Sequence, residues 1–206
     1  MRLETERLIL REPKLSDWKD IVEGIGNINI AKYLATVPYP YKKKDAYWWL
    51  NKEIKLSKDK KRESYHFLIE LKYEKKIIGC IGLLKINPNY KIAETGSWIN
   101  KDYHKKGYIT EAKIAVNEFA FNKLKLRKLE TGIFTENEAS NATQKAVGYK
   151  YEGTRIKHAV CKATGKIHDE NLYGLMKDDW KKHLPRLKKH LRDKIKRLKE
   201  EEKNKK

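Results

Sequence analysis

Cysteine is nearly absent from this chain of 206 residues. Its two cysteines, Cys80 and Cys161, stand alone, with no second cysteine nearby. This spacing argues against a disulfide framework and against a cysteine zinc site, and it fits a reducing, cytoplasmic location. We therefore expect no metal site, and we expect both thiols to be small buried groups in the core.

Long apolar runs are missing as well. The longest segment without a charged residue, 33–41, has nine residues, whereas a membrane span needs about 20. The opening residues MRLETER contain no apolar segment of the kind found in signal peptides. We expect neither a membrane span nor a secretory leader.

Acidic residues are few relative to basic ones. Lys and Arg number 48 against 28 Asp and Glu, which gives a net charge of +20. Twelve Tyr, five Trp and four Phe argue against a disordered chain, and 39% hydrophobic residues suffice for one core. The charge predicts an anionic partner and leaves nucleic acid, acidic proteins and phosphorylated cofactors open.

Strands and helices alternate along most of the chain, which predicts one layered α/β (α+β) domain over 1–176. The expected strands are 7–11, 65–71, 77–84, 93–100, 129–135, 148–152 and 167–176, with 156–161 as a further candidate. One expected helix begins after Ser16-Asp17, and three others cover 44–56, 110–124 and 138–147.

Residues 177–206 are interpreted as a basic amphipathic helical extension with a net charge of +8. Pro185 suits the first turn of a new helix. An apolar stripe follows it, made of Leu187, Leu191, Ile195 and Leu198. The stripe would pack on the body or on a second subunit of a homodimer. The alternative is an element that binds RNA or another acidic surface.

The segment that carries most chemistry is 93–112, AETGSWINKDYHKKGYITEA. A strand ends near Asn100, a turn with two lysines and Gly107 follows, and a helix begins near Thr110. Amides in the first turn of a helix have no partner within the helix, and the helix dipole attracts anions there. The segment therefore predicts a phosphate site, although an ordinary capped helix has the same pattern.

These residues do not stand alone, because further motifs follow in order. With them the chain resembles the GNAT-fold N-acetyltransferases, and within that superfamily the RimJ/RimL type that acetylates the N-terminal alanine of ribosomal proteins. The matching segments are ETERLILR (4–11), GCIGL (79–83), ETGSWI (94–99), GYITEA (107–112), NEAS (137–140) and GYKYEG (148–153), closed by Asp169, Tyr173 and Trp180.

The resemblance implies a mixed, mostly antiparallel central sheet flanked by helices. It also implies that acetyl-CoA, the cosubstrate, binds between two splayed parallel strands, 93–100 and 129–135. Backbone groups near Trp98 and Ile99 would bind the pantetheine arm, and Asn137 would contact it from the second strand. The pyrophosphate would lie on the turn formed by His104, Lys105, Lys106, Gly107, Tyr108, Ile109 and Thr110.

Two residues of that turn depart from the family pattern. His104 replaces a Gln or Arg, and Ile109 replaces a small residue. The Ile109 amide is still present, but its β-branched side chain would crowd the phosphate or shift the start of the helix. Lys105 and Lys106 would compensate electrostatically.

Glu94 and Ser140 are the catalytic candidates that the resemblance implies. Glu94 would act as general base, through water, and Ser140 would protonate the leaving sulfur. The alternative for Glu94 is a strand carboxylate paired with a lysine. For Ser140 and Asn137 the alternative is capping of a helix start. No acyl-enzyme is expected, because the amine attacks the thioester directly.

The expected activity is acetyl transfer to a primary amine, above all the N-terminal α-amino group of a protein such as a ribosomal protein. Two alternatives stay open. One is a small-amine acetyltransferase acting on a polyamine or an aminoglycoside. The other is a GNAT-like protein without catalysis that contacts RNA or the ribosome through its basic surface and tail.

Overall fold

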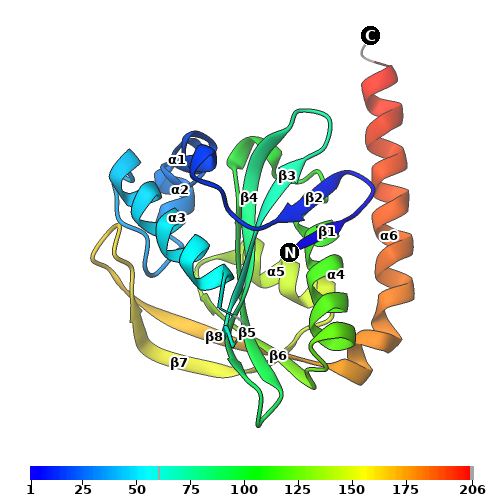
Figure 1. Ribbon diagram of the computed structural model, residues 1–206. Coiled ribbons are helices and arrows are strands. Elements are labelled where there is room, and N and C mark those ends of the chain that lie inside the picture. The colour runs from blue at the N-terminus through cyan, green and yellow to red at the C-terminus, as the bar shows by residue number, and fades with distance from the viewer. Residues whose placement is uncertain (60, 205–206) are drawn as a thin grey trace.

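The computed structural model describes residues 1–59 and 61–204, and it contains one eight-stranded sheet with helices on both faces (Figure 1). The strands are β1 (Arg2–Glu4), β2 (Leu8–Arg11), β3 (Tyr65–Leu71), β4 (Lys76–Asn87), β5 (Ile92–Ile99), β6 (Lys128–Phe134), β7 (Lys150–Val160) and β8 (Ile167–Met176). The helices are α1 (Trp18–Ile25), α2 (Ile28–Ala31), α3 (Lys43–Ser57), α4 (Tyr108–Glu118), α5 (Glu138–Val147) and α6 (Lys177–Lys203).

The strand order is β1-β2-β3-β4-β5-β6-β8-β7, and only β5 and β6 pair in parallel. This confirms the expected mixed, mostly antiparallel sheet. None of the helices in the described part of the chain combines the length and the apolarity that crossing a lipid bilayer requires.

Alternating residues of the strands build two cores, one on each face. Phe67, Ile69 and Leu71 of β3 pack under α4, α5 and α6, whereas Leu68 packs under α1, α2 and α3. Side chains of a strand point to opposite faces with a period of two, so one strand supplies both cores. The sheet is thereby fixed from both sides, and β5 and β6 lie in its middle.

The expected α6 boundary at Pro185 is wrong, because α6 begins at Lys177 and Pro185 lies inside it. Met176 is extended and ends β8, and the helix starts at once with Asp178 and Asp179 in its first turn, where carboxylates are favoured. Trp180 is buried, so the start of the helix is held by the core.

The apolar stripe of α6 packs on the body of the same chain. Leu187, Leu191 and Ile195 belong to the core under α4 and α5, and Leu198 is only half-buried. Figure 1 shows α6 running alongside α4. Residues 205–206 of the expected extension lie outside the described residues.

Three further boundaries differ from expectation. Helix α4 begins at Tyr108 rather than Thr110, and it changes at Phe119 into a π-helical turn that ends at Lys123. Residues 148–152 and 156–161 are not separate strands, since β7 covers Lys150–Val160 with irregular pairing between Arg155 and Ala159. The short strand β1 has no apolar pattern of its own.

Candidate active site

Strands β5 and β6 separate soon after they meet. Their parallel register covers only Ile92, Ala93 and Glu94, opposite Lys128, Leu129 and Glu130. At the next residues, hydrogen bonds from side chains take the place of the backbone hydrogen bonds between the two strands. The Thr131 hydroxyl donates to the Thr95 carbonyl at 2.8 Å, and the Thr95 hydroxyl donates to the Glu130 carbonyl at 3.2 Å. Beyond these threonines the strands diverge, which leaves an opening between β5 and β6.

Backbone groups of β5 line this opening at alternate residues. The Asn100 amide donates to Ile78 of β4, and the Trp98 carbonyl also lies against β4, next to Gly79. Ser97 and Ile99 therefore turn their backbone groups the other way, toward the opening. His104 contributes here, because its Nε2 lies 3.0 Å from the Ile99 carbonyl. The Trp98 ring packs beside Gly24 of α1.

The expected phosphate turn, residues 104–110, leads from β5 into α4. Lys105 and Gly107 have positive φ angles of 61° and 81°, and no side chain caps the helix. The first-turn amides, those of Tyr108, Ile109 and Thr110, thus have no partner in the helix. Ile109 packs against the core, so its side chain does not cover them. The turn therefore suits an anion despite Ile109.

A buried ion pair that the sequence did not suggest anchors this turn. Arg7 Nε donates to Glu111 at 2.7 Å, and the Thr5 hydroxyl donates to the same carboxylate at 2.6 Å. Arg7 also donates to the Lys106 carbonyl at 2.9 Å, and its guanidinium lies 4.2 Å from the centre of the Tyr108 ring. The loop between β1 and β2 thus holds the phosphate turn in place through Arg7.

Helix α6 contacts the same turn. A Cβ built on Gly107 would lie 3.1 Å from Leu191 Cδ1 and 3.6 Å from Lys194 Cδ. Lys194 makes no ion pair with the described residues. The C-terminal extension therefore packs on the phosphate turn, which composition alone could not indicate.

The end of β6 carries Asn137 and Ser140. The Asn137 side chain accepts from the Ser140 amide at 3.2 Å, so it caps α5 as the alternative interpretation expected. The Ser140 hydroxyl has no hydrogen bond within the described chain. Asn141 holds this turn in place, because its side chain donates to the Phe134 and Asn137 carbonyls and accepts from Tyr173.

Glu94 lies on the sheet face opposite the one that α4, α5 and α6 cover, and we call this face the acceptor face. Glu94 shares this face with Gly96 and Trp98 by strand alternation. Its carboxylate is 43% exposed and lies 2.9 Å from Lys85 Nζ, which matches the ion-pair alternative. Glu130 follows the same pattern on β6, and Glu170 of β8 lies directly over Gly132. Carboxylates thus gather on this face.

Burial changes the pKa of several groups near the opening. Lys113 on α4 is almost fully buried, has no ion pair within the described residues, and burial lowers its pKa to about 8. Its ammonium lies 6.0 Å from the Tyr149 ring. Burial raises the pKa of the Cys80 thiol, and both cysteines are buried and free, as expected. Within residues 1–59 and 61–204, no three His, Cys, Asp or Glu side chains gather as metal ligands would.

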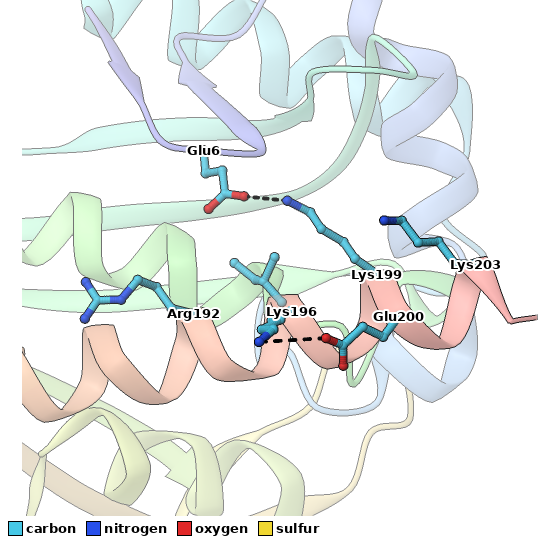
Figure 2. A pocket seen from close by; sticks show the side chains of 7 residues that line it. Glu6, Arg192, Lys196, Lys199, Glu200 and Lys203 are labelled. Atoms are coloured by element: carbon cyan, nitrogen blue, oxygen red, sulfur yellow. Dashed lines mark hydrogen bonds and ion pairs between the residues drawn. The ribbon is translucent and has the colours of Figure 1, made fainter.

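A surface groove of about 340 Å³ lies elsewhere, between α6 and the loop after β1 (Figure 2). Lys199 spans it to reach Glu6 at 2.9 Å, and Lys196 pairs with Glu200 along the helix. None of the predicted site residues lines this groove. The Lys199–Glu6 pair ties α6 to the body, which is a structural role.

Comparison with known proteins identifies the family of this chain. Residues 7–150 match the acetyltransferase (GNAT) domain family. The uncharacterized N-acetyltransferase YnaD of Bacillus subtilis (strain 168) is 28% identical over 180 residues, which cover 87% of this chain and 99% of YnaD.

Two solved structures share the fold. The ribosomal-protein-S5-alanine acetyltransferase from Vibrio fischeri has a TM-score of 0.73 at 20% identity, over 87% of this chain and 98% of its own. The microcin C7 self-immunity acetyltransferase MccE, crystallised with acetyl-CoA and AMP, has a TM-score of 0.72 at 20% identity, over 84% and 93%. The protein thus belongs to the GNAT family and is an acetyl-CoA-dependent N-acetyltransferase.

Proposed function

We propose that the enzyme acetylates the N-terminal α-amino group of a protein, and that a ribosomal protein is the acceptor. The observation that carries this proposal is the free edge of the sheet beside the acceptor face. Strand β7 ends the strand order, is exposed along most of its length, and has no strand on its outer side among the described residues. An extended peptide can add to such an edge through main-chain hydrogen bonds.

The exposed apolar side chains of β7 fit the same acceptor. Ile156 and Val160 are 69% and 57% exposed, and a peptide laid along β7 would cover them. The carboxylates of the acceptor face would attract the positively charged N-terminus. The structural likeness to the Vibrio fischeri enzyme, whose name gives ribosomal protein S5 as its substrate, supports this acceptor class.

Acetyl-CoA would occupy the other side of the opening. The free first-turn amides of α4, with Lys105 and Lys106, would hold its pyrophosphate. Backbone groups of Ser97 and Ile99 would pair with the amides of its pantetheine arm. Asn137 orders the turn that brings Ser140 to this side. The thioester would then reach through the opening toward the acceptor face.

The transfer needs one proton acceptor and one proton donor. A base takes a proton from the ammonium group, and the freed nitrogen lone pair forms a bond to the thioester carbon. As the C–S bond breaks, its electron pair leaves on sulfur, and the remaining surplus proton of the nitrogen passes to that sulfur. We assign this relay to the unbonded Ser140 hydroxyl. Glu94 is the base candidate suggested by the sequence.

Replacement of Ser140 tests this assignment. Ser140→Ala should lower kcat about 100-fold, within the range for a lost acid–base group, and leave the calorimetric Kd for acetyl-CoA unchanged. Thr143→Ala on the same helix is the matched control, since that hydroxyl bonds only the helix backbone. Full activity of the Ser140 variant would refute the role of Ser140, and absence of acetyl-CoA binding to the wild type would refute the site.

A small cationic amine is a second candidate acceptor, because one observation favours it. Glu94, Glu130 and Glu170 face the same side of the sheet, although Lys85, Lys128 and Arg155 each neutralise one of them in part. A polyamine could compete for these carboxylates. Rates with spermidine and with a peptide beginning in Ala or Ser would separate the two acceptors.

A further inference from the structure

One buried histidine on β8, the strand next to β6, has an unused ring nitrogen. His168 of β8 is only 7% exposed and stacks on Phe134 with ring centres 4.2 Å apart. Its Nδ1 lies 3.2 Å from both carboxylate oxygens of Glu136. Its Nε2 is buried and has no hydrogen-bond partner within the described residues.

Glu136 is suited to hold this imidazole. Its pKa is lowered to about 2, first by a hydrogen bond from its own backbone amide and then by His168. Because the carboxylate is ionised, it fixes the proton of the ring on Nδ1. The lone pair of a neutral ring then lies on Nε2. Lys166 also approaches Glu136, at 3.5 Å.

Strand alternation places His168 on the acceptor face. Tyr173 and Leu175 of β8 point into the core under α5, so His168 and Glu170, at odd separations from them, point to the other face. Phe134, the stacking partner, lies on β6 at the same parity as Glu130 and Gly132. His168 and Glu94 thus face the same side of the sheet.

The two candidates lie at different levels of the opening. Phe134 is four residues beyond Glu130, the register partner of Glu94, which is about 13 Å along a strand. Glu136 immediately precedes Asn137, the cap of the turn that carries Ser140. His168 is therefore level with the proposed proton donor, and Glu94 is at the narrow end of the opening.

A buried polar atom without a partner costs about 1–3 kcal/mol, and a catalytic role is one of the recognised reasons for keeping it. The other charged groups near β8 are partnered, since Glu170 lies beside Arg155 and His158. A neutral imidazole with a free lone pair on Nε2 can also act as a general base.

We propose that His168, oriented by Glu136, is the base that deprotonates the acceptor amine through one water held at the buried Nε2. This inference rests on the proposed function and names a residue for its first step. Through that water, His168 Nε2 takes one proton from the ammonium group and becomes an imidazolium, paired with the Glu136 carboxylate. The imidazolium returns to the neutral ring by releasing that proton to solvent after the acetylated product has formed. Glu94 then serves to attract the cationic acceptor.

The pH profile of kcat/KM tests the proposal. For the wild type we expect an acid-side inflection in the range where an imidazole titrates. His168→Gln should lower kcat/KM about 100-fold at neutral pH and abolish that inflection, with the Kd for acetyl-CoA unchanged. Glu136→Gln should lower kcat/KM and keep the inflection, because the imidazole remains but loses the carboxylate that orients it. Glu94→Gln should keep the inflection.

His190→Gln, an exposed histidine of α6, is the matched control and should behave as the wild type. The Glu136 variant keeps the imidazole and still reports if His168→Gln folds poorly. The proposal is overturned if His168→Gln keeps the inflection or if Glu94→Gln removes it. A wild type that binds acetyl-CoA and acetylates no peptide instead refutes the proposed function.

Discussion

The buried charge of Lys113 makes the stability of the fold depend on pH. Its pKa, lowered to about 8 by burial, is below the ordinary 10.5, so the unfolded chain binds this proton more tightly than the folded one. The charge therefore destabilises the fold fully below about pH 8, and stability rises between pH 8 and 10.5 as the folded state loses the proton first.

Lys113→Met should accordingly increase the free energy of unfolding by about 2–3 kcal/mol at pH 7 and flatten its rise above pH 8. Urea unfolding at several pH values measures both effects. Lys145→Met, an exposed position on α5, is the control and should change little. A Lys113 variant less stable than the wild type at pH 7 would mean that the ammonium has a stabilising partner.

Gly107 is a second residue with a measurable role. Its φ of 81° strains any other residue by about 1–2 kcal/mol, and an added Cβ would also press on Leu191. Gly107→Ala should destabilise the protein and weaken acetyl-CoA binding several-fold by calorimetry. Gly165→Ala, with φ of 70° and open space around it, should cause strain without loss of affinity. Equal affinities would place the cofactor away from the turn.

At the scale of elements, α6 belongs to the core that supports the turn. Leu191→Ala should cost about 2–5 kcal/mol of unfolding free energy, because it leaves a cavity beside Gly107, and it should also weaken acetyl-CoA binding. Leu198→Ala, half-buried one helical turn past Ile195, should cost much less. Thermal unfolding with and without acetyl-CoA measures both, and equal losses for the two variants would contradict the packing described.

The elements that sequence patterns located correctly are those with strong local signals. Strand β3, helix α5 and strand β8 have the expected bounds, since period-two alternation, the Asn137 cap and Gly148 at the helix end mark them. The helix start predicted from Pro185 was wrong, because a helix tolerates an internal proline when buried residues hold it on both sides. Here Trp180 and Leu187 are those buried residues. Such compensation is tertiary and has no local pattern.

The same division applies to the site. Short motifs predicted the phosphate turn, Asn137 and Ser140, because each is contiguous in sequence. The pairs Arg7–Glu111 and Glu136–His168 join residues of different elements, and only the packed sheet brings them together. Lys194 reaches Gly107 only because α6 runs back along α4. The sequence contained these residues but no spacing that revealed the pairing.

For the whole molecule, the net charge of +20 has more than one meaning. We propose that Lys105 and Lys106 of the phosphate turn serve the cofactor, whereas Lys188 and Lys199 tie α6 to Glu118 and Glu6. Arg186, Lys189 and Arg197 are exposed on α6 and have no ion pair within the described residues. These three remain available to an anionic partner.

If RNA contact occurs through α6, those three cations should contribute to its salt dependence. Replacing all three with Gln should reduce the slope of log Kd against log salt by about 2–3, at about one per phosphate contact, and leave acetyl transfer unchanged. Fluorescence anisotropy with a short RNA measures the slope. An unchanged slope would exclude this face of α6 as the contact surface.

The identity of the acceptor is the most direct test of the proposed function. Acetyl-CoA, a peptide with a free N-terminal Ala or Ser, the same peptide with a blocked N-terminus, and spermidine can be offered together and resolved by mass spectrometry. We expect one acetyl group on the α-amine of the free peptide, none on the blocked peptide, and slower transfer to spermidine. Preferential acetylation of spermidine, or of lysine in the blocked peptide, would contradict N-terminal acetylation.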